Sequence, residues 1–99
     1  MRGKMEIPKT VRIIDSVITV EIGTVACAIG FSDYQNNKII IDPTVSDSMK
    51  QEIFYHELVH WILFKMHNKL EADERFVGLF GSLLNQSLTS AGIKLQQED

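Results

Sequence analysis

A single cysteine stands in this chain of 99 residues, at position 27. One thiol cannot form a disulfide within the chain, so the fold must be held together by its core. Nothing charged flanks Cys27 that would favour a reactive thiolate. Unpaired cysteines of proteins in reducing compartments are usually buried as small apolar residues. We therefore expect Cys27 to be buried and unreactive, and we expect the protein to act in the cytoplasm.

Long apolar runs are missing as well. No stretch approaches the roughly 18 consecutive apolar residues that a membrane-spanning helix needs. Residues 1–6 carry charges and no apolar run follows them, which is unlike a secretory signal peptide. We therefore expect a protein that is neither inserted into a membrane nor exported.

Charge of one sign is not concentrated anywhere. The formal net charge is −3, and the 10 Lys and Arg residues are scattered. Direct electrostatic binding of nucleic acid needs a basic patch or stripe, so we expect a protein or peptide partner instead. The apolar fraction of 44% allows a modest core, and the length corresponds to one domain over residues 1–99.

The first half of the chain has the pattern of a β-sheet. Four segments rich in β-branched or apolar residues are separated by polar residues typical of turns. The first two segments predict a hairpin around Asp15 and Ser16, and the fourth ends before Pro43. The expected strands are residues 10–14, 17–22, 27–31 and 38–42.

The second half has the pattern of two helices. Residues 49–67 contain no Gly or Pro and are apolar on all sides, which is typical of a buried helix. Residues 44–48 supply several possible N-caps, and Ser48 with Gln51 fits a capping box at its start. A second helix is expected from about residue 70 to residue 88. Strands followed by helices predict an α+β fold, with a mixed or antiparallel sheet and two packed helices.

The segment His56-Glu57-Leu58-Val59-His60 carries the strongest chemical signal. On an α-helix, His56 and His60 lie on one face one turn apart, where both imidazoles can bind one zinc ion. Glu57 lies one step round the helix and can reach a water on the metal. Zinc lowers the pKa of that water, Glu57 accepts its proton, and the hydroxide attacks a carbonyl carbon. Glu57 can then pass the proton to the leaving amine, so the motif predicts metal-assisted hydrolysis.

A catalytic zinc ion needs a third protein ligand and one open position. Glu71 and Glu74 are three apart at the start of the second helix and share a face, whereas Asp73 points elsewhere. We favour Glu74 as the ligand and keep Glu71 as the alternative; either carboxylate could instead complement the helix dipole. His67 lies seven residues beyond His60, about 10 Å along a helix. We therefore expect His67 to be a polar residue at the helix end.

Residues 39–85 resemble the small gluzincin-type metallopeptidases, closest to the ImmA/IrrE type and the short H-E-x-x-H proteins of phages and prophages. In those proteins a strand and a Pro-containing turn lead into the H-E-x-x-H helix. A second helix then carries a Glu, followed by a small residue three positions later, an aromatic or aliphatic residue six later and a small residue seven later. Glu74, Val77, Phe80 and Gly81 fit that register, and a register starting at Glu71 fits less well.

The same resemblance implies a zincin-like fold, a zinc cofactor, a hydrolytic role for Glu57 and intracellular action on a protein substrate. The family often has Asn or Asp four residues after its ligand Glu. That position is Gly78 here, so a partner for a metal ligand is missing or comes from elsewhere.

Three further features of the sequence have expected roles. Tyr55 could donate to an oxyanion, but we expect it to pack in the core. Trp61 is expected in the core as well. Residues 38–41 are expected to form the sheet edge beside the zinc cleft, where an extended peptide could add as a strand.

The resulting hypothesis is a zinc-dependent metallopeptidase with His56, His60 and Glu74 as ligands and Glu57 as the base. The alternative is a binding or regulatory module that keeps a zincin fold without cleaving anything, and the resemblance would allow such a module to derive from a phage or prophage. A purely structural zinc site ranks last, because it leaves Glu57 unexplained.

Overall fold

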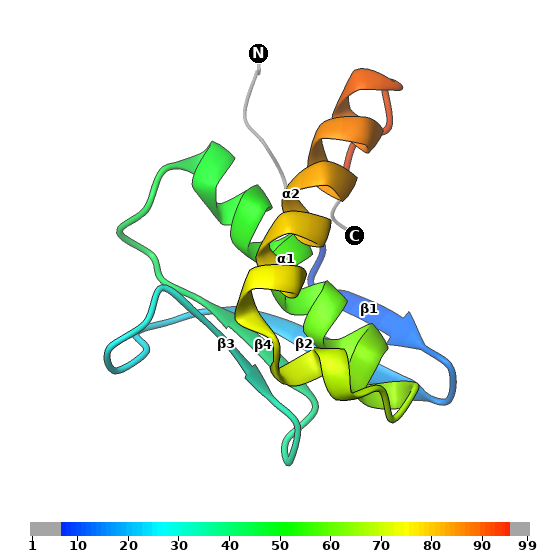
Figure 1. Ribbon diagram of the computed structural model, residues 1–99. Helices are drawn as coiled ribbons and strands as arrows, with labels where there is room; N and C mark the ends of the chain where they lie inside the picture. The colour runs from blue at the N-terminus through cyan, green and yellow to red at the C-terminus, as the bar shows by residue number, and fades with distance from the viewer. Residues whose placement is uncertain (1–6, 96–99) are drawn as a thin grey trace.

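Residues 7–95 are described in the computed structural model, which places four strands before two α-helices and a short 3-10 helix between them (Figure 1). This order confirms the α+β class. The strands are β1 (Thr10–Ile13), β2 (Ser16–Ile22), β3 (Gly30–Asp33) and β4 (Lys38–Ile41). The helices are α1 (Asp47–Lys65), the short 3-10 helix η1 (Lys69–Ala72) and α2 (Glu74–Ser90). None of the helices among the described residues has the length and apolar character to cross a membrane.

The four strands form one mixed sheet in the order β1-β2-β4-β3. β1 and β2 form the expected antiparallel hairpin, β3 and β4 form a second one, and β2 runs parallel to β4. The expectation that residues 38–41 form the edge beside the cleft is therefore wrong, because β4 lies between β2 and β3. Its Ile39-Ile40-Ile41 run suits an interior strand, and the edge position belongs to β3.

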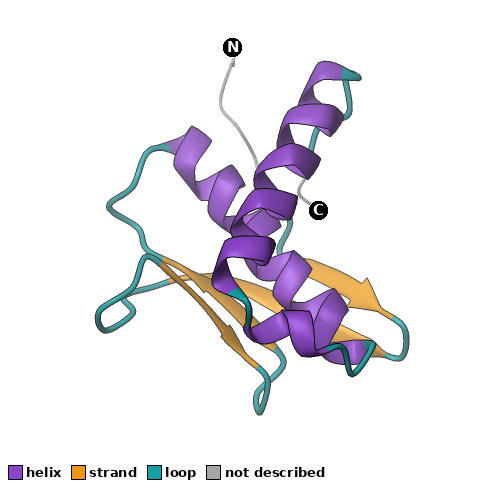
Figure 2. Ribbon diagram, viewed as in Figure 1, coloured by secondary structure: helices purple, strands orange, loops and turns teal. Residues whose placement is uncertain are grey.

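Both long helices lie on one face of the sheet, with α1 against the strands and α2 crossing α1 (Figure 2). Ile18, Ile39 and Ile41 point from the sheet into the core and are fully buried. From α1, Trp61 is equally buried, and its indole N–H donates to the carbonyl of Lys38 at 3.3 Å. These contacts fix α1 across the strands. The expected core position of Trp61 is confirmed.

The N-cap of α1 is one of the candidates in residues 44–48, but not the one that the capping box favoured. Ser46 is the N-cap, and its hydroxyl accepts the N–H of Met49 at 3.2 Å, so the capping box at Ser48 and Gln51 is wrong. Gln51 is instead buried, and its amide donates to the side chain of Asn85 on α2 at 2.7 Å. A Ser-rich approach offers several hydroxyls for one cap, and sequence spacing alone did not separate them.

The C-terminal end of α1 confirms the expected role of His67. His67 adopts a φ of 54°, the left-handed conformation that ends many helices. Its N–H donates to the carbonyl of Phe64 at 3.0 Å, and the N–H of Asn68 donates to the carbonyl of Leu63 at 2.9 Å. These two bonds satisfy carbonyls that the last turn would leave unpaired. His67 is exposed and lies outside the metal-binding group described below.

The expected second helix is divided in two. η1 is a single turn that Asn68 caps through a 2.9 Å bond from Leu70 N–H. α2 then begins at Glu74, where the side chain of Asp73 accepts the N–H of Phe76 at 3.0 Å. Because of this break, Glu71 and Glu74 belong to different elements and face the site from different sides.

Cys27 corrects another expectation. It is exposed, and it adopts a φ of 61° in the turn before β3. A residue with this φ is not extended and cannot belong to a regular strand, and the strand expected over residues 27–31 begins only at Gly30.

Two glycines bring α2 against α1 at His56. A Cβ added to the buried Gly81 would lie 3.1 Å from the Cα and 3.2 Å from the N of His56. A Cβ added to Gly78 would lie 3.8 Å from His56 Cε1, an ordinary contact distance. Gly81 therefore sets the distance between the helices, because its neighbours are backbone atoms that cannot move aside.

Replacing Gly81 by Ala is expected to lower the free energy of unfolding by about 1–3 kcal/mol, the usual cost of overpacking. Gly78→Ala in the same helix is the matched control. It should be neutral or stabilising by up to about 1 kcal/mol, because Ala has the higher helix propensity. Urea unfolding followed by circular dichroism measures both. Equal effects of the two substitutions would contradict this account of the helix contact.

Candidate metal centre

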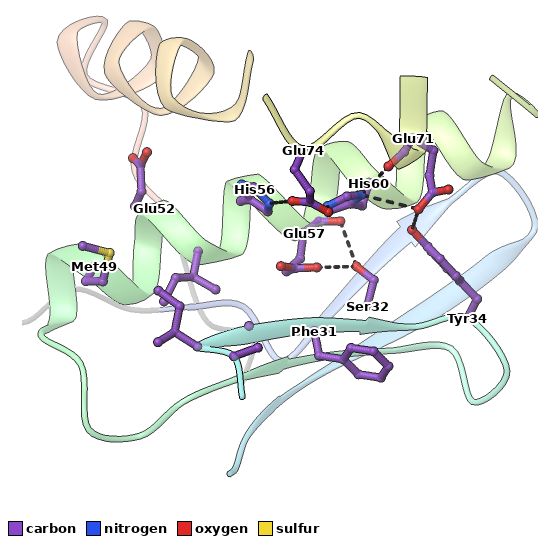
Figure 3. Close-up of a pocket in the computed structure, with 14 residues that line it drawn as sticks. Phe31, Ser32, Tyr34, Met49, Glu52, His56, Glu57, His60, Glu71 and Glu74 are labelled. Atoms are coloured by element: carbon purple, nitrogen blue, oxygen red, sulfur yellow. Dashed lines mark hydrogen bonds and ion pairs between the residues drawn. The ribbon is translucent and has the colours of Figure 1, made fainter. Parts of the chain in front are cut away.

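Helix α1 and the first turn of α2 bring three potential ligands together (Figure 3). His56 and His60 lie one turn apart on α1, with ring centroids 5.0 Å from each other. Glu74 reaches between them from α2: its Oε1 lies 3.1 Å from His56 Nε2, and its Oε2 lies 3.1 Å from His60 Nε2. One donor atom from each residue falls within a group no wider than 4.8 Å.

This donor set fits a zinc ion in type and in number. Two imidazole nitrogens and one carboxylate are ligands that zinc accepts, and three protein ligands leave one position open. The side chain of His60 is 8% exposed, that of His56 is 28% exposed and that of Glu74 is 72% exposed. The site is therefore closed on the α1 side and open at Glu74, where a substrate could enter.

Glu71, the alternative ligand, lies on the other side of His60. Its backbone carbonyl lies 2.8 Å from His60 Nδ1, and its carboxylate Oε2 lies 3.5 Å from the same nitrogen. The carbonyl is the nearest acceptor to either ring nitrogen, because Glu74 Oε2 lies 3.1 Å from Nε2. It therefore favours the tautomer with its proton on Nδ1, which leaves the lone pair of Nε2 for a metal. The structure therefore brings Glu74 together with the two histidines, and it places Glu71 behind one of them.

Glu57 points from α1 toward strand β3. Its side chain is buried, and the hydroxyl of Ser32 donates to Glu57 Oε1 at 2.7 Å. Burial raises the pKa of Glu57, and the hydrogen bond from Ser32 acts in the opposite direction. A Cβ added to Gly30 would meet Ile53 and would lie 3.1 Å from Glu57 Oε2. The missing side chain at Gly30 thus lets β3 approach α1 closely enough to cover this carboxylate.

A cleft of about 580 Å³ runs along β3 and the exposed side of α1. One part is lined by the histidines and carboxylates described above. The part toward the start of α1 is lined by apolar side chains, among them Ile29, Met49 and Ile53. The cleft therefore combines a polar centre with apolar walls, as ligand sites usually do.

Sequence reasoning missed two residues of this cleft, Ser32 and Tyr34. The Tyr34 hydroxyl donates to Glu71 Oε2 at 2.7 Å, and burial together with Glu71 raises the pKa of this phenol. Ser32 lay just outside the strand expected over residues 27–31, and Tyr34 lay in a segment assigned only as a turn. Side chains of a strand alternate between its two faces, so a strand predicted over residues 30–33 would have placed the side chain of Ser32 on the same face as Gly30, toward α1.

Tyr55, considered as an oxyanion donor, is 3% exposed and lies in the core beside Phe54. It does not line the cleft among the described residues. The expected packing role of Tyr55 is confirmed.

Replacing Glu74 by Gln is expected to reduce zinc affinity at least about tenfold, because the third ligand is lost. Glu71→Gln is the matched control and should retain zinc, because the amide oxygen of Gln can still accept the Tyr34 hydroxyl and so keep the backbone carbonyl at His60 Nδ1. Elemental analysis after dialysis against a weak chelator measures both. Loss of zinc in Glu71→Gln alone would reassign the third ligand.

Comparison with known proteins adds no relative. No family model matches the chain, and neither a curated protein nor a solved structure matches it. The function of this protein is therefore inferred from its own residues and their geometry.

Proposed function

We propose that this chain is a zinc-dependent metallopeptidase that hydrolyses a peptide bond in the cleft between β3 and α1. One observation supports it above the others: the buried carboxylate of Glu57 lies beside a converging set of two imidazoles and a carboxylate, in one cleft. A zinc ion held by His56, His60 and Glu74 would polarise a substrate carbonyl and lower the pKa of a water.

Glu57 acts first as the base and then as the acid. Its carboxylate takes a proton from the attacking water, whose oxygen bonds to the carbonyl carbon of the peptide. The same group then gives this proton to the amide nitrogen as the carbon–nitrogen bond breaks, so a carboxylic acid and an amine leave. Ser32 orients Glu57 through its 2.7 Å hydrogen bond to Oε1. This bond restricts the rotamer, which keeps the carboxylate near the reacting atoms.

The free edge of β3 supports a peptide as the substrate. Among residues 7–95, no strand pairs with the outer side of β3. The carbonyl of Ile29 accepts the N–H of Asp42 on the β4 side at 3.0 Å. Because antiparallel pairing alternates along a strand, the N–H and C=O groups of Gly30 and Ser32 face the free edge. An extended peptide can add there as a fifth strand, directly beside Glu57.

A second function, peptide binding without hydrolysis, is favoured by the same edge. Strand addition at Gly30 and Ser32 needs neither a proton transfer nor a metal. The chain would then be a binding or regulatory module with a zincin-like fold. The two functions differ in whether the carboxylate of Glu57 is needed for a chemical step.

Replacing Glu57 by Gln is expected to reduce peptide cleavage by the zinc-loaded protein about 10²- to 10⁴-fold, the usual contribution of a general base. Zinc content should not change, because the three ligands remain. Cleavage of a random peptide library, read by mass spectrometry, measures the effect. Glu21→Gln is the control, a carboxylate that pairs with Lys38 on the sheet at 2.9 Å.

The outcomes of this experiment separate the two functions. Cleavage that survives in Glu57→Gln contradicts the proposed mechanism. A wild-type protein that holds zinc and binds peptides but cleaves none supports the binding module.

Peptide binding at the edge of β3 is expected to slow amide hydrogen exchange at Gly30 and Ser32. A peptide hydroxamate is a suitable probe, because its hydroxamate can bind the metal while its peptide part extends along the strand. The amides of Phe31 and Asp33 serve as internal controls, since they face β4 and should exchange slowly with or without the probe. Unchanged exchange at Gly30 and Ser32 on saturation would argue against strand addition.

A further inference from the structure

The turn between β3 and β4 reaches the metal centre through one side chain. Tyr34 begins this turn, and its hydroxyl donates to Oε2 of Glu71 at 2.7 Å (Figure 3). Glu71 belongs to η1, which is 37 residues away in sequence. This bond therefore joins the sheet to the segment that lies behind His60.

Tyr34 is held rigidly by aromatic neighbours. Its ring stacks on that of Phe64 with centroids 4.0 Å apart and an interplanar angle of 9°. It also meets the ring of Trp61 edge to face at 4.9 Å. Because Trp61 is fully buried and bonded to the β4 backbone, the phenol has little freedom to move. The hydroxyl is therefore presented at a fixed place, independently of Glu71.

The short helix η1, by contrast, has few interactions with the rest of the protein that fix its position. None of its residues is buried. The capping bonds of Asn68 and Asp73 lie within η1 or lead into α2. Within the described chain, the polar contacts that tie η1 to the sheet and to α1 are made by Glu71: its carboxylate contacts Tyr34, and its carbonyl and, at 3.5 Å, its carboxylate contact His60 Nδ1.

We propose that Tyr34 is a positioning residue for the metal centre, whose hydroxyl holds Glu71 so that η1 stays against Nδ1 of His60. When the carbonyl of Glu71 is held beside Nδ1, it accepts the Nδ1 proton of His60, and the lone pair of Nε2 is then available to a metal. The same bond keeps the carboxylate of Glu71 on the far side of the ring, away from Glu74. The inference rests on the proposed function in one respect, that His60 is a metal ligand.

Tyr34→Phe tests this directly, because it removes the hydroxyl and leaves the aromatic stack in place. Zinc affinity, measured by competition with a chromophoric chelator, should fall about 10- to 100-fold, the usual effect of losing such a partner. Tyr55→Phe is the matched control. It removes another buried phenol hydroxyl, one that does not line the cleft, and should leave zinc affinity within about twofold.

A double substitution shows whether Tyr34 acts through Glu71. Glu71→Ala removes the carboxylate that Tyr34 holds, so it should weaken zinc binding to a similar degree. Adding Tyr34→Phe to Glu71→Ala should then have little further effect. An equal loss on adding Tyr34→Phe in both backgrounds would overturn the proposed route. Glu71→Ala also replaces Tyr34→Phe as the test if the latter does not fold.

A second measurement is made on the metal-free protein and needs neither zinc nor cleavage. The chain has 3 His, so ¹⁵N-imidazole NMR at about pH 8 can report the tautomer of each ring separately. In the wild type, His60 should carry its proton mainly on Nδ1, because the Glu71 carbonyl at 2.8 Å is a nearer acceptor than Glu74 Oε2 at 3.1 Å from Nε2. The Nδ1–H fraction should fall in Tyr34→Phe and remain unchanged in Tyr55→Phe.

The two measurements distinguish failure of the inference from failure of the proposed function. An identical His60 tautomer in wild type and Tyr34→Phe overturns the inference, even if zinc binds and Glu57-dependent cleavage is found. A changed tautomer in a protein that neither binds zinc nor cleaves peptides supports the role of Tyr34 and contradicts the peptidase.

Discussion

The candidate site depends on how closely strand β3 lies on helix α1. Gly30 faces Ile53 and Glu57, where a side chain as small as Ala would collide with Ile53. Ser32, two residues on, then comes near enough to donate to Glu57. Because β3 is an edge of the sheet that residues 7–95 form, this contact also brings a free backbone edge beside the carboxylate of Glu57. In the proposed function, the orientation of the base and the docking of a peptide would both follow from this one close contact.

The contact has an energetic cost that points to function. Covering Glu57 raises its pKa above the value in the unfolded chain. In the metal-free protein the folded state therefore holds this proton more tightly than the unfolded state does. The free energy of unfolding must then fall as the pH rises from the unfolded pKa through the folded one. A buried carboxylate at this place destabilises the metal-free fold near neutral pH, whereas a bound cation would offset its charge. Natural sequences keep such destabilising groups mainly where function requires them.

The sequence was sufficient to predict the elements with a regular periodic pattern of residues. Alternating β-branched residues predicted the β1–β2 hairpin, and the Gly-free stretch predicted α1 with His56 and His60 on one face. The sequence was insufficient where the conformation of one turn or the path of one connection determines where a strand begins or which strands it pairs with. The left-handed conformation of Cys27 delayed β3 to Gly30, and a central position for β4 depends on a crossover that strand propensity does not encode. The sequence also did not indicate the roles of Ser32 and Tyr34. Both roles depend on contacts with residues that are 25 and 37 positions away in sequence.

The two histidines of the motif are equivalent in sequence, but the fold makes them different. His60 is buried and meets the backbone of Glu71 at Nδ1, so its ring is fixed before any metal arrives. His56 is more exposed and lies under α2 at the two glycines, where Gly78 offers no side chain to its Nδ1. The close helix contact at Gly78 and Gly81 thus leaves Nδ1 of His56 without a side-chain acceptor from these positions, unlike Nδ1 of His60, which faces the carbonyl of Glu71. A metal ion would therefore meet one rigid imidazole and one that can adjust, with the exposed Glu74 closing the set. In such an arrangement the position of the metal would be set mainly by His60, the ligand that lies against Glu71, and Glu71 is in turn held by Tyr34.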